Sequence, residues 1–395
     1  MENSRQYQSG CYIALLTAGH FLSDFYVTFL PGLLPMVIER LGLSLTLSGL
    51  LVMIYSFTSN LLQPVFGYYV DKSGYSWMVL LTIPVSAVFI CLSAAADSIF
   101  TLFLYITLSG LAASLFHPLA SALLGKVSTA ENKGLGMSFF IGGGNFGVAA
   151  APAVVMFFLF YFSADQLIWL AIPGLLVTWG YYWTGMHRMP LGRVPQIQDT
   201  ASQNSVPWYR SASLLKLNVV MGLRAWPQSV IPNFMPVWLL QQGHSPALAG
   251  SMITVFLFGG AIGSIFGGYL GDRMGRKPCI IASLAICIPA LYVFLASREV
   301  TLLTWAALWI SGACLQATLP SSVVWAQEML PANAAMASGM MMGLAFGLGG
   351  GGRCHYRADC RFYWPAAGIA AVDCATGTGC RHCGDDSRQK NGADV

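Results

Sequence analysis

Eleven runs of about 20 apolar residues restrict the fold of this chain more than any other feature of its sequence. About 20 residues is the length that an α-helix needs to cross the hydrocarbon core of a bilayer. Only 9% of the 395 residues are charged, whereas soluble proteins have about 25%, so a soluble fold is excluded. The sequence therefore predicts an all-α membrane protein. The runs begin near Cys11, Leu47, Trp77, Ile99, Gly134, Gln166, Leu214, Ala247, Pro278, Val300 and Ser338.

A polar segment separates the sixth run from the seventh and divides the chain into two parts. It spans residues 186–213 and contains Arg188, Arg193, Pro195, Pro207 and Arg210, a composition typical of a linker. We expect an N-terminal six-helix bundle over residues 1–185, a cytoplasmic linker over 186–213, and a partial C-terminal bundle over 214–352. The first run lacks a small-residue cleavage site and is followed by further runs, so we expect a retained helix and not a signal peptide.

A charged motif between two apolar runs occurs twice in the chain. Residues 268–277 read Gly-Tyr-Leu-Gly-Asp-Arg-Met-Gly-Arg-Lys, and residues 67–74 read Gly-Tyr-Tyr-Val-Asp-Lys-Ser-Gly, 201 positions earlier. The same offset relates five further residues of each part, so the sequence indicates a duplication of a half-domain. These pairs are Pro31 and Pro232, Pro35 and Pro236, Gly42 and Gly243, Ser44 and Ser245, and Gly49 and Gly250.

The repeated aspartates are candidates for a gate at the cytoplasmic side. A short loop can place its Asp at the N-terminus of a helix in the other half, where the helix dipole attracts a carboxylate, while the basic neighbours stay in water. A solvated loop without such a contact is the alternative. In the first copy Tyr75 and Ser76 replace two basic residues, so the role there depends mainly on Asp71. The candidate gate residues are Asp71, Lys72, Gly268, Asp272, Arg273, Gly275, Arg276, Lys277 and, at the inner end of helix ten, Glu328.

The repeated motif resembles the loop signature of the major facilitator superfamily, whose members are twelve-helix secondary transporters. The resemblance implies two six-helix bundles related by a pseudo-twofold axis. It also implies that the fifth and eleventh helices slide against their neighbours during transport. Glycines in these helices favour close helix packing rather than nucleotide binding, since no strand precedes them. They are Gly142, Gly143, Gly144 and Gly147 in the fifth helix, and Gly343, Gly347, Gly349 and Gly350 in the eleventh.

Loop charges predict the orientation in the membrane. With a cytoplasmic N-terminus, the outer loops contain only Arg40 and Arg298, and the inner loops contain the other basic residues, as the positive-inside rule requires. We therefore expect a multi-pass protein of the bacterial inner membrane. The inner basic residues are Arg5, Lys72, Lys126, Lys133, Arg188, Arg193, Arg210, Lys216, Arg273, Arg276 and Lys277.

Four ionisable side chains lie inside apolar runs: His20, Asp24, His117 and Arg224. Insertion of an Asp or Arg side chain at the centre of a membrane helix costs about 2.5–3.5 kcal/mol. Each of the four residues therefore needs a polar partner or a hydrated cavity. Because Asp24 and Arg224 are nearly equivalent under the 201-residue offset, we expect them to approach each other across a central cavity. A purely structural ion pair, and for His117 a satisfied core histidine, are the alternatives.

Further stretches resemble the fosmidomycin-resistance type of exporter within the superfamily. This resemblance implies a proton-driven exporter of small anionic drugs. The chemistry of the buried residues suits this activity: His20, Asp24 and His117 are candidates for proton coupling, and Arg224 and Asn145 are candidates for substrate binding. We expect the protein to act as a monomer. Proton-coupled uptake of an organic anion remains an alternative, and a membrane receptor or enzyme is a distant one. The stretches are His20–Asp24, Gln63–Gly67, Leu115–Pro118, Gly143–Gly147 and Ala326–Pro331.

Sequence motifs for other activities are not evident. Basic residues form no stripe for nucleic acid, and we expect no cofactor and no enzyme activity. Residues 353–395 interrupt the apolar pattern and contain five of the ten cysteines, but their spacing fits no paired zinc motif, so we expect no metal site. Cys codons read one base later encode Val or Ala, and we therefore expect a shifted reading frame after about Gly350 and the loss of helix twelve.

Overall fold

The computed structural model describes residues 2–129, 131–191, 209, 211–297 and 299–344. These residues form helices joined by short loops, and no strand occurs among them, so the predicted all-α fold is confirmed for this part of the chain. Residues 192–208 and 210 of the expected linker lie outside the described residues. So do the expected aberrant tail at 353–395 and the position of the expected frame change.

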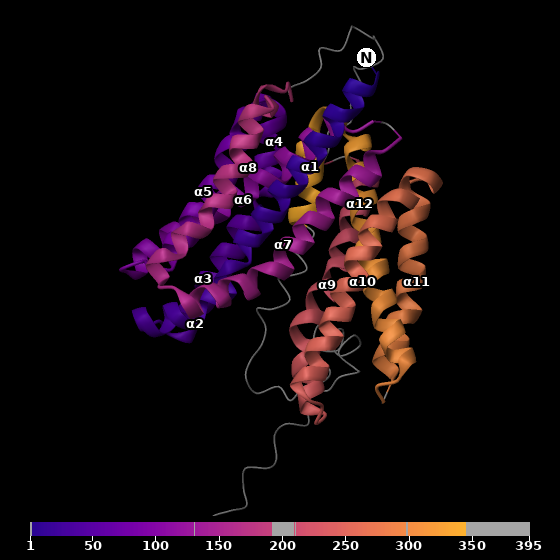
Figure 1. Ribbon diagram of the computed structural model, residues 1–395. Coiled ribbons are helices and arrows are strands. Elements are labelled where there is room, and N and C mark those ends of the chain that lie inside the picture. Colours follow the sequence, from indigo (N-terminus) through magenta and orange to yellow (C-terminus); the bar gives the residue numbers. More distant parts are fainter. Residues whose placement is uncertain (1, 130, 192–208, 210, 298, 345–395) are drawn as a thin grey trace, which may run out of the picture.

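The helices fall into two groups that lie side by side, with α7 between them in the view of Figure 1. Short 3₁₀ or π segments join or extend several helices. The first group consists of α1 Glu2–Val27, α2 Phe29–Leu41, α3 Leu45–Ser56, α4 Gln63–Ser73, α5 Val79–Ser93, α6 Ile99–Val127, α7 Lys133–Tyr161 and α8 Ile172–Trp183. The second group consists of α9 Ala212–Gln241, α10 Pro246–Met274, α11 Arg276–Ala296, α12 Leu302–Met329 and α13 Ala334–Gly339. The last of these, α13, also packs against α4 and α6 of the first group.

Among the described residues, eight helical segments are long and apolar enough to cross a membrane. They correspond to the first five predicted runs and to the eighth, ninth and tenth. The sixth run is divided between the 3₁₀ segment Ala164–Ala171 and α8. The seventh, α9, contains the polar residues Lys216, Asn218 and Arg224, which lower its hydropathy. The eleventh continues beyond residue 344, outside the described residues.

Contacts between distant segments define the two ends of the helical bundle. At one end, the Ser9 hydroxyl donates to Val127 O (2.5 Å) and the Ser76 hydroxyl donates to His187 O (2.8 Å). At the other end, Arg40 donates to Ala96 O (2.7 Å). The first end therefore contains the ends of α4 and α6 and the start of α7, with their basic residues. The end of α10 and the start of α11 lie there too, because Asp272 of α10 contacts the start of α7. Among the described residues, the predicted charge asymmetry between the two ends is present.

Helices α1 and α7 pack closely where α7 is rich in glycine. A Cβ atom at Gly143 would lie 2.6 Å from Thr17 O of α1, and one at Gly147 would collide with Phe21 O. Only a residue without a side chain fits at these positions, which confirms the packing role predicted for Gly143 and Gly147 but not for Gly142, where a Cβ would meet nothing closer than 4.0 Å. Gly343 contacts Asn60 in the same manner, whereas Gly347, Gly349 and Gly350 lie outside the described residues.

Candidate transport site and gate

A buried cluster of two histidines and one aspartate joins α1 to α6. His117 Nε2 lies 2.8 Å from Asp24 Oδ1, and His20 Nε2 lies 3.3 Å from Asp24 Oδ2. His20 and His117 are 2% and 7% exposed, whereas the side chain of Asp24 is 20% exposed. The structure thus brings together the three residues predicted to couple protons, and Asp24 retains some access to its surroundings.

Backbone carbonyls fix the orientation of both imidazole rings. His20 Nδ1–H donates to Phe140 O (2.6 Å), and His117 Nδ1–H donates to Ala113 O (2.9 Å), because a carbonyl oxygen only accepts. The His20 ring also stacks on Phe140, with centroids 4.0 Å apart. In each ring the Nε2 atom therefore faces Asp24 with a lone pair unless it carries an additional proton. Each histidine–aspartate contact needs a proton or another cation between two acceptor atoms.

Arg224 on α9 is held by hydrogen bonds to α12. The residue is 3% exposed, and its Nε–H donates to Leu315 O (2.8 Å) on α12. Its Nη2 atom donates to Gln316 Oε1. No direct ion pair joins Arg224 to Asp24 among the described residues, since Asp24 pairs with His20 and His117. The expected approach of the two residues across a central cavity stays a prediction. The sequence offset gives the depth of a residue along its helix, but the side chains of neighbouring helices decide its partners.

A hydrogen bond between amide side chains connects the two groups of helices. Gln316 Nε2 donates to Asn145 Oδ1 (3.2 Å), so Arg224, Gln316 and Asn145 form one chain from α9 through α12 to α7. Asn145 follows Gly144, and a Cβ at Gly144 would lie 2.7 Å from His20 Nε2. Adjacent residues of α7 thus face the histidine cluster on one side and the arginine network on the other. Asn145 Nδ2 is buried and has no hydrogen-bond partner among the described residues.

At the end of the bundle that carries the basic residues, the carboxylate of Asp272 caps α7 of the other group. It accepts hydrogen bonds from the backbone N–H groups of Gly134 and Leu135, both at 2.9 Å. Arg276 donates to the same carboxylate (2.6 Å) and lies 3.4 Å from Glu328. Because the first backbone N–H groups of a helix lack intrahelical partners, the contact satisfies two of them and places a negative charge at the positive end of the dipole.

The first copy of the motif makes an equivalent contact in the opposite direction. Asp71 at the end of α4 accepts hydrogen bonds from Ala335 N (3.0 Å) and Met336 N (2.8 Å), at the start of α13. A Cβ atom at Gly67 would lie 2.6 Å from Ala335 O. The predicted contact between each aspartate and a helix of the other half is present in both copies. Its function as a gate stays a proposal.

The remaining predicted gate residues surround these contacts. A Cβ at Gly268 would collide with Gly134 O and the Ser138 hydroxyl, so Gly268 permits the approach of α10 to α7. Gly275 separates α10 from α11 with a φ of +91°, a value that favours glycine. The guanidinium of Arg273 lies 4.8 Å from the centroid of the Tyr269 ring. Lys72 lies in the last turn of α4, and Lys277 lies in the first turn of α11.

Two polar residues of the spans were missed by the sequence analysis. Gln316 lies in the arginine network, and Gln327 donates to Ser121 O (3.2 Å) and to the Ser338 hydroxyl (2.8 Å), which connects α12 with α6 and α13. A glutamine in an apolar run is costly without a partner, as a charged residue is. A search of the runs for buried amides as well as charges would have found both.

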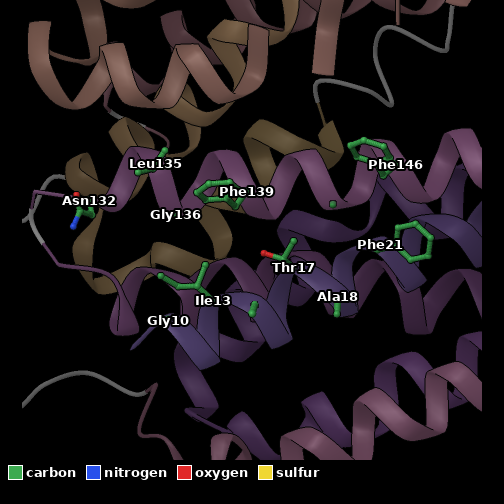
Figure 2. A pocket seen from close by; sticks show the side chains of 12 residues that line it. Gly10, Ile13, Thr17, Ala18, Phe21, Asn132, Leu135, Gly136, Phe139 and Phe146 are labelled. Atoms are coloured by element: carbon green, nitrogen blue, oxygen red, sulfur yellow. The ribbon is translucent and has the colours of Figure 1, made fainter. Parts of the chain in front are cut away.

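A groove of about 770 Å³ lies between α1 and α7, close to the cluster but separate from it (Figure 2). Its walls include Ile13, Phe21, Leu135, Phe139 and Phe146, and they are almost entirely apolar. Neither Asp24 nor Arg224 lines it. The groove therefore suits a hydrocarbon surface and not an anion, and the candidate transport site is the polar region around Asp24 and Arg224.

The sequence profile of the Major Facilitator Superfamily matches residues 16–226 and 217–371. The chain is 27% identical over 349 residues to the fosmidomycin resistance protein of Escherichia coli (strain K12), which covers 86% of this chain and 83% of that protein. It is 29% identical over 336 residues to the uncharacterized MFS-type transporter YfnC of Bacillus subtilis (strain 168), which covers 84% and 81% of the two chains.

Solved structures of transporters share the fold. The proton:xylose symporter XylE aligns with a TM-score of 0.64 at 15% identity, covering 87% of both chains. The human organic anion transporter MFSD10 aligns with a TM-score of 0.60 at 16% identity, covering 86% of this chain and 92% of that one. At these identities the likeness shows the fold alone.

Proposed function

Since the chain belongs to the major facilitator superfamily, we propose that it is a proton-coupled secondary transporter that exports small anionic compounds of the phosphonate or carboxylate class. Family and fold indicate a transporter rather than an enzyme. The observation that carries the proposal is the presence of two buried polar networks on opposite groups of helices, linked by the hydrogen bond between Asn145 and Gln316.

Arg224 is the anion ligand of the proposed site. Its guanidinium is buried and is oriented by Leu315 O and Gln316, so it keeps a fixed direction within the span. A guanidinium in a fixed orientation suits the two oxygens of a carboxylate or phosphonate. Asn145 adds a buried amide N–H donor at the end of the same network. The similarity to the fosmidomycin resistance protein supports a small anionic drug as substrate.

His20, Asp24 and His117 carry the proton in the proposal. Imidazole gains and loses protons near neutral pH, and the geometry places two imidazole nitrogens against one carboxylate. Loading and release of a proton change the charge next to Gly144 of α7. Asn145, the next residue of the same helix, belongs to the proposed anion site. Helix α7 can therefore couple the binding of the substrate to the release of the proton.

The proposed arrangement in the cell follows from the charges. The end with the basic residues faces the cytoplasm, in the inner membrane of a bacterium, with the N-terminus on the same side. Two bundles, at residues 1–185 and 214–352, move against each other on either side of the linker at 186–213. The contacts of Asp71 and Asp272 close the cytoplasmic end in the conformation described here.

Everted membrane vesicles test the proposal directly. Radiolabelled fosmidomycin should accumulate in vesicles with the wild-type chain when a proton gradient is imposed, and collapse of the gradient should abolish accumulation. Vesicles with Asp24→Asn should accumulate none, at equal protein level. Accumulation that requires the opposite gradient would indicate uptake by symport. Equal accumulation in vesicles lacking the protein would refute transport of this substrate.

A further inference from the structure

Three potential metal ligands converge inside the first group of helices. The ligand atoms of His20, Asp24 and His117 all lie within 4.8 Å of one another. A tetrahedral zinc ion with bonds of about 2.0–2.1 Å holds its ligand atoms roughly 3.3 Å apart. The separation of His20 Nε2 from Asp24 Oδ2, 3.3 Å, equals this spacing. The separation of His117 Nε2 from the other carboxylate oxygen, Oδ1, is 2.8 Å, so binding of an ion requires a shift of about 0.5 Å there.

The surroundings of the rings match those of metal-binding histidines. A ligating histidine usually donates its second ring N–H to a carbonyl or carboxylate, which fixes the tautomer and turns the other nitrogen toward the metal. His20 does so with Phe140 O, and His117 does so with Ala113 O, from two different helices. Both Nε2 lone pairs and the carboxylate therefore face one another, and this arrangement of acceptors attracts a cation.

Room for an ion is provided by a glycine of the facing helix. A Cβ atom at Gly144 would collide with Asp24 Oδ2 and would lie 2.7 Å from His20 Nε2. The absence of a side chain at this position keeps Asp24 Oδ2 and His20 Nε2 free of a covering methyl group. The 20% exposure of the Asp24 side chain leaves one side of the cluster accessible. Three protein ligands with an open position are typical of sites that add water or a substrate oxygen as a fourth ligand.

We propose that His20, Asp24 and His117 form a binding site for a divalent transition-metal ion of the Zn²⁺ class. Two imidazoles and one carboxylate favour Zn²⁺, Co²⁺ or Ni²⁺ over Mg²⁺ and Ca²⁺, which prefer oxygen ligands. The inference does not depend on the proposed function, because it concerns equilibrium binding. Where both hold, the metal and the transported proton exclude each other.

Titration of the purified full chain with Co²⁺ tests the site. The protein should carry an affinity tag without histidine. Tetrahedral Co²⁺ has a characteristic visible absorption, and thiolate ligands add a strong near-ultraviolet band that His and Asp do not give. Residues 353–395 contain Cys and His and could also bind Co²⁺. The thiolate band distinguishes Co²⁺ bound by these cysteines from Co²⁺ bound by His20, Asp24 and His117. The wild-type chain should bind one Co²⁺ without a thiolate band, and Zn²⁺ should displace it while excess Mg²⁺ should not.

Matched variants identify the ligands. Asp24→Asn and His117→Gln should each weaken the binding by at least about tenfold, whereas His187→Gln and His244→Gln, outside the cluster, should leave it unchanged. Gly144→Ala should weaken binding with all three ligands present, and Gly142→Ala should not, since a Cβ there meets nothing closer than 4.0 Å. Circular dichroism and gel filtration select the variants that fold. Equal Co²⁺ affinity in wild type, Asp24→Asn and Gly144→Ala, or a signal with a thiolate band only, would overturn the proposal.

Discussion

Asp71 and Asp272 make equivalent contacts in opposite directions, each accepting two backbone N–H groups at the start of a helix in the other group. Both contacts lie at the end of the bundle that carries the basic residues. Each couples the last turn of α4 or α10 to the dipole of a helix in the other group. If the groups separate at this end, four backbone N–H groups lose a charged acceptor. The four hydrogen bonds therefore stabilise the closed arrangement.

Asp272→Ala should therefore open the basic end. The loss of a carboxylate at a helix N-terminus costs about 0.3–1 kcal/mol, and up to about 2 kcal/mol where it is partly buried. The population of the opened form should rise several-fold. Labelling rates of a cysteine placed on the inner side measure this change. Asp165→Ala is the control, since it removes a carboxylate beyond the opposite end of α7, and an identical labelling rate in wild type and Asp272→Ala would contradict a role in closure.

Asp24→Asn should abolish proton-coupled transport and leave the protein inserted in the membrane. The amide keeps the shape of the side chain but cannot bind and release a proton in the same way. Transport in vesicles and the amount of protein in the membrane are measured together. Full resistance to an exported drug in cells with normal expression of the variant would count against the proton-coupling role.

Arg224→Lys should retain partial transport, whereas Arg224→Ala should remove it. Lysine keeps a positive charge but lacks the planar fork of donors that suits a phosphonate or carboxylate. Competition binding of anionic substrates to purified protein should show the weaker affinity. Equal affinity in wild type and Arg224→Ala would exclude Arg224 as the anion ligand.

The double variant Asp24→Asn with Arg224→Ala should be as inactive as the single variants. Asp24 is paired with His20 and His117, and Arg224 is held by Leu315 O and Gln316, so the two residues belong to different networks. Their effects on thermal stability should add, as for sites without a shared partner. Recovery of substantial efflux in the double variant would show that the two residues form a structural pair after all.

Gln316→Glu should reduce the affinity for anions while conserving side-chain volume. A carboxylate at this position would lie against the Arg224 guanidinium and compete with the substrate for its charge. Gln327→Glu, on the same helix but bonded to Ser121 and Ser338, is the matched control. If both variants lowered the substrate affinity equally, the effect would be one of folding and not of the anion site.

The sequence by itself determined the class of fold and the contacts of the two repeated aspartates with helices of the other group. Apolar runs of bilayer length exclude any fold except a membrane helical bundle, because unsatisfied backbone groups are too costly in lipid. The repeated Gly and Asp residues predicted the contacts of Asp71 and Asp272, because a helix N-terminus and a loop carboxylate are features of local sequence. The sequence also identified the four titratable residues within the runs, because a charged or titratable side chain buried in a membrane helix is costly without a partner.

Only the tertiary structure decided which of these side chains are partners. Asp24 and Arg224 occupy nearly equivalent places in the two parts of the chain, yet His117 on α6 and His20 one turn earlier on α1 bind Asp24, and Gln316 on α12 binds Arg224. A duplication offset fixes depth along a helix but not the rotation of that helix or the neighbours it meets. Partners on α6, α7 and α12 are set by packing, such as the approach of α7 to α1 at Gly143, Gly144 and Gly147, and therefore depend on the whole fold.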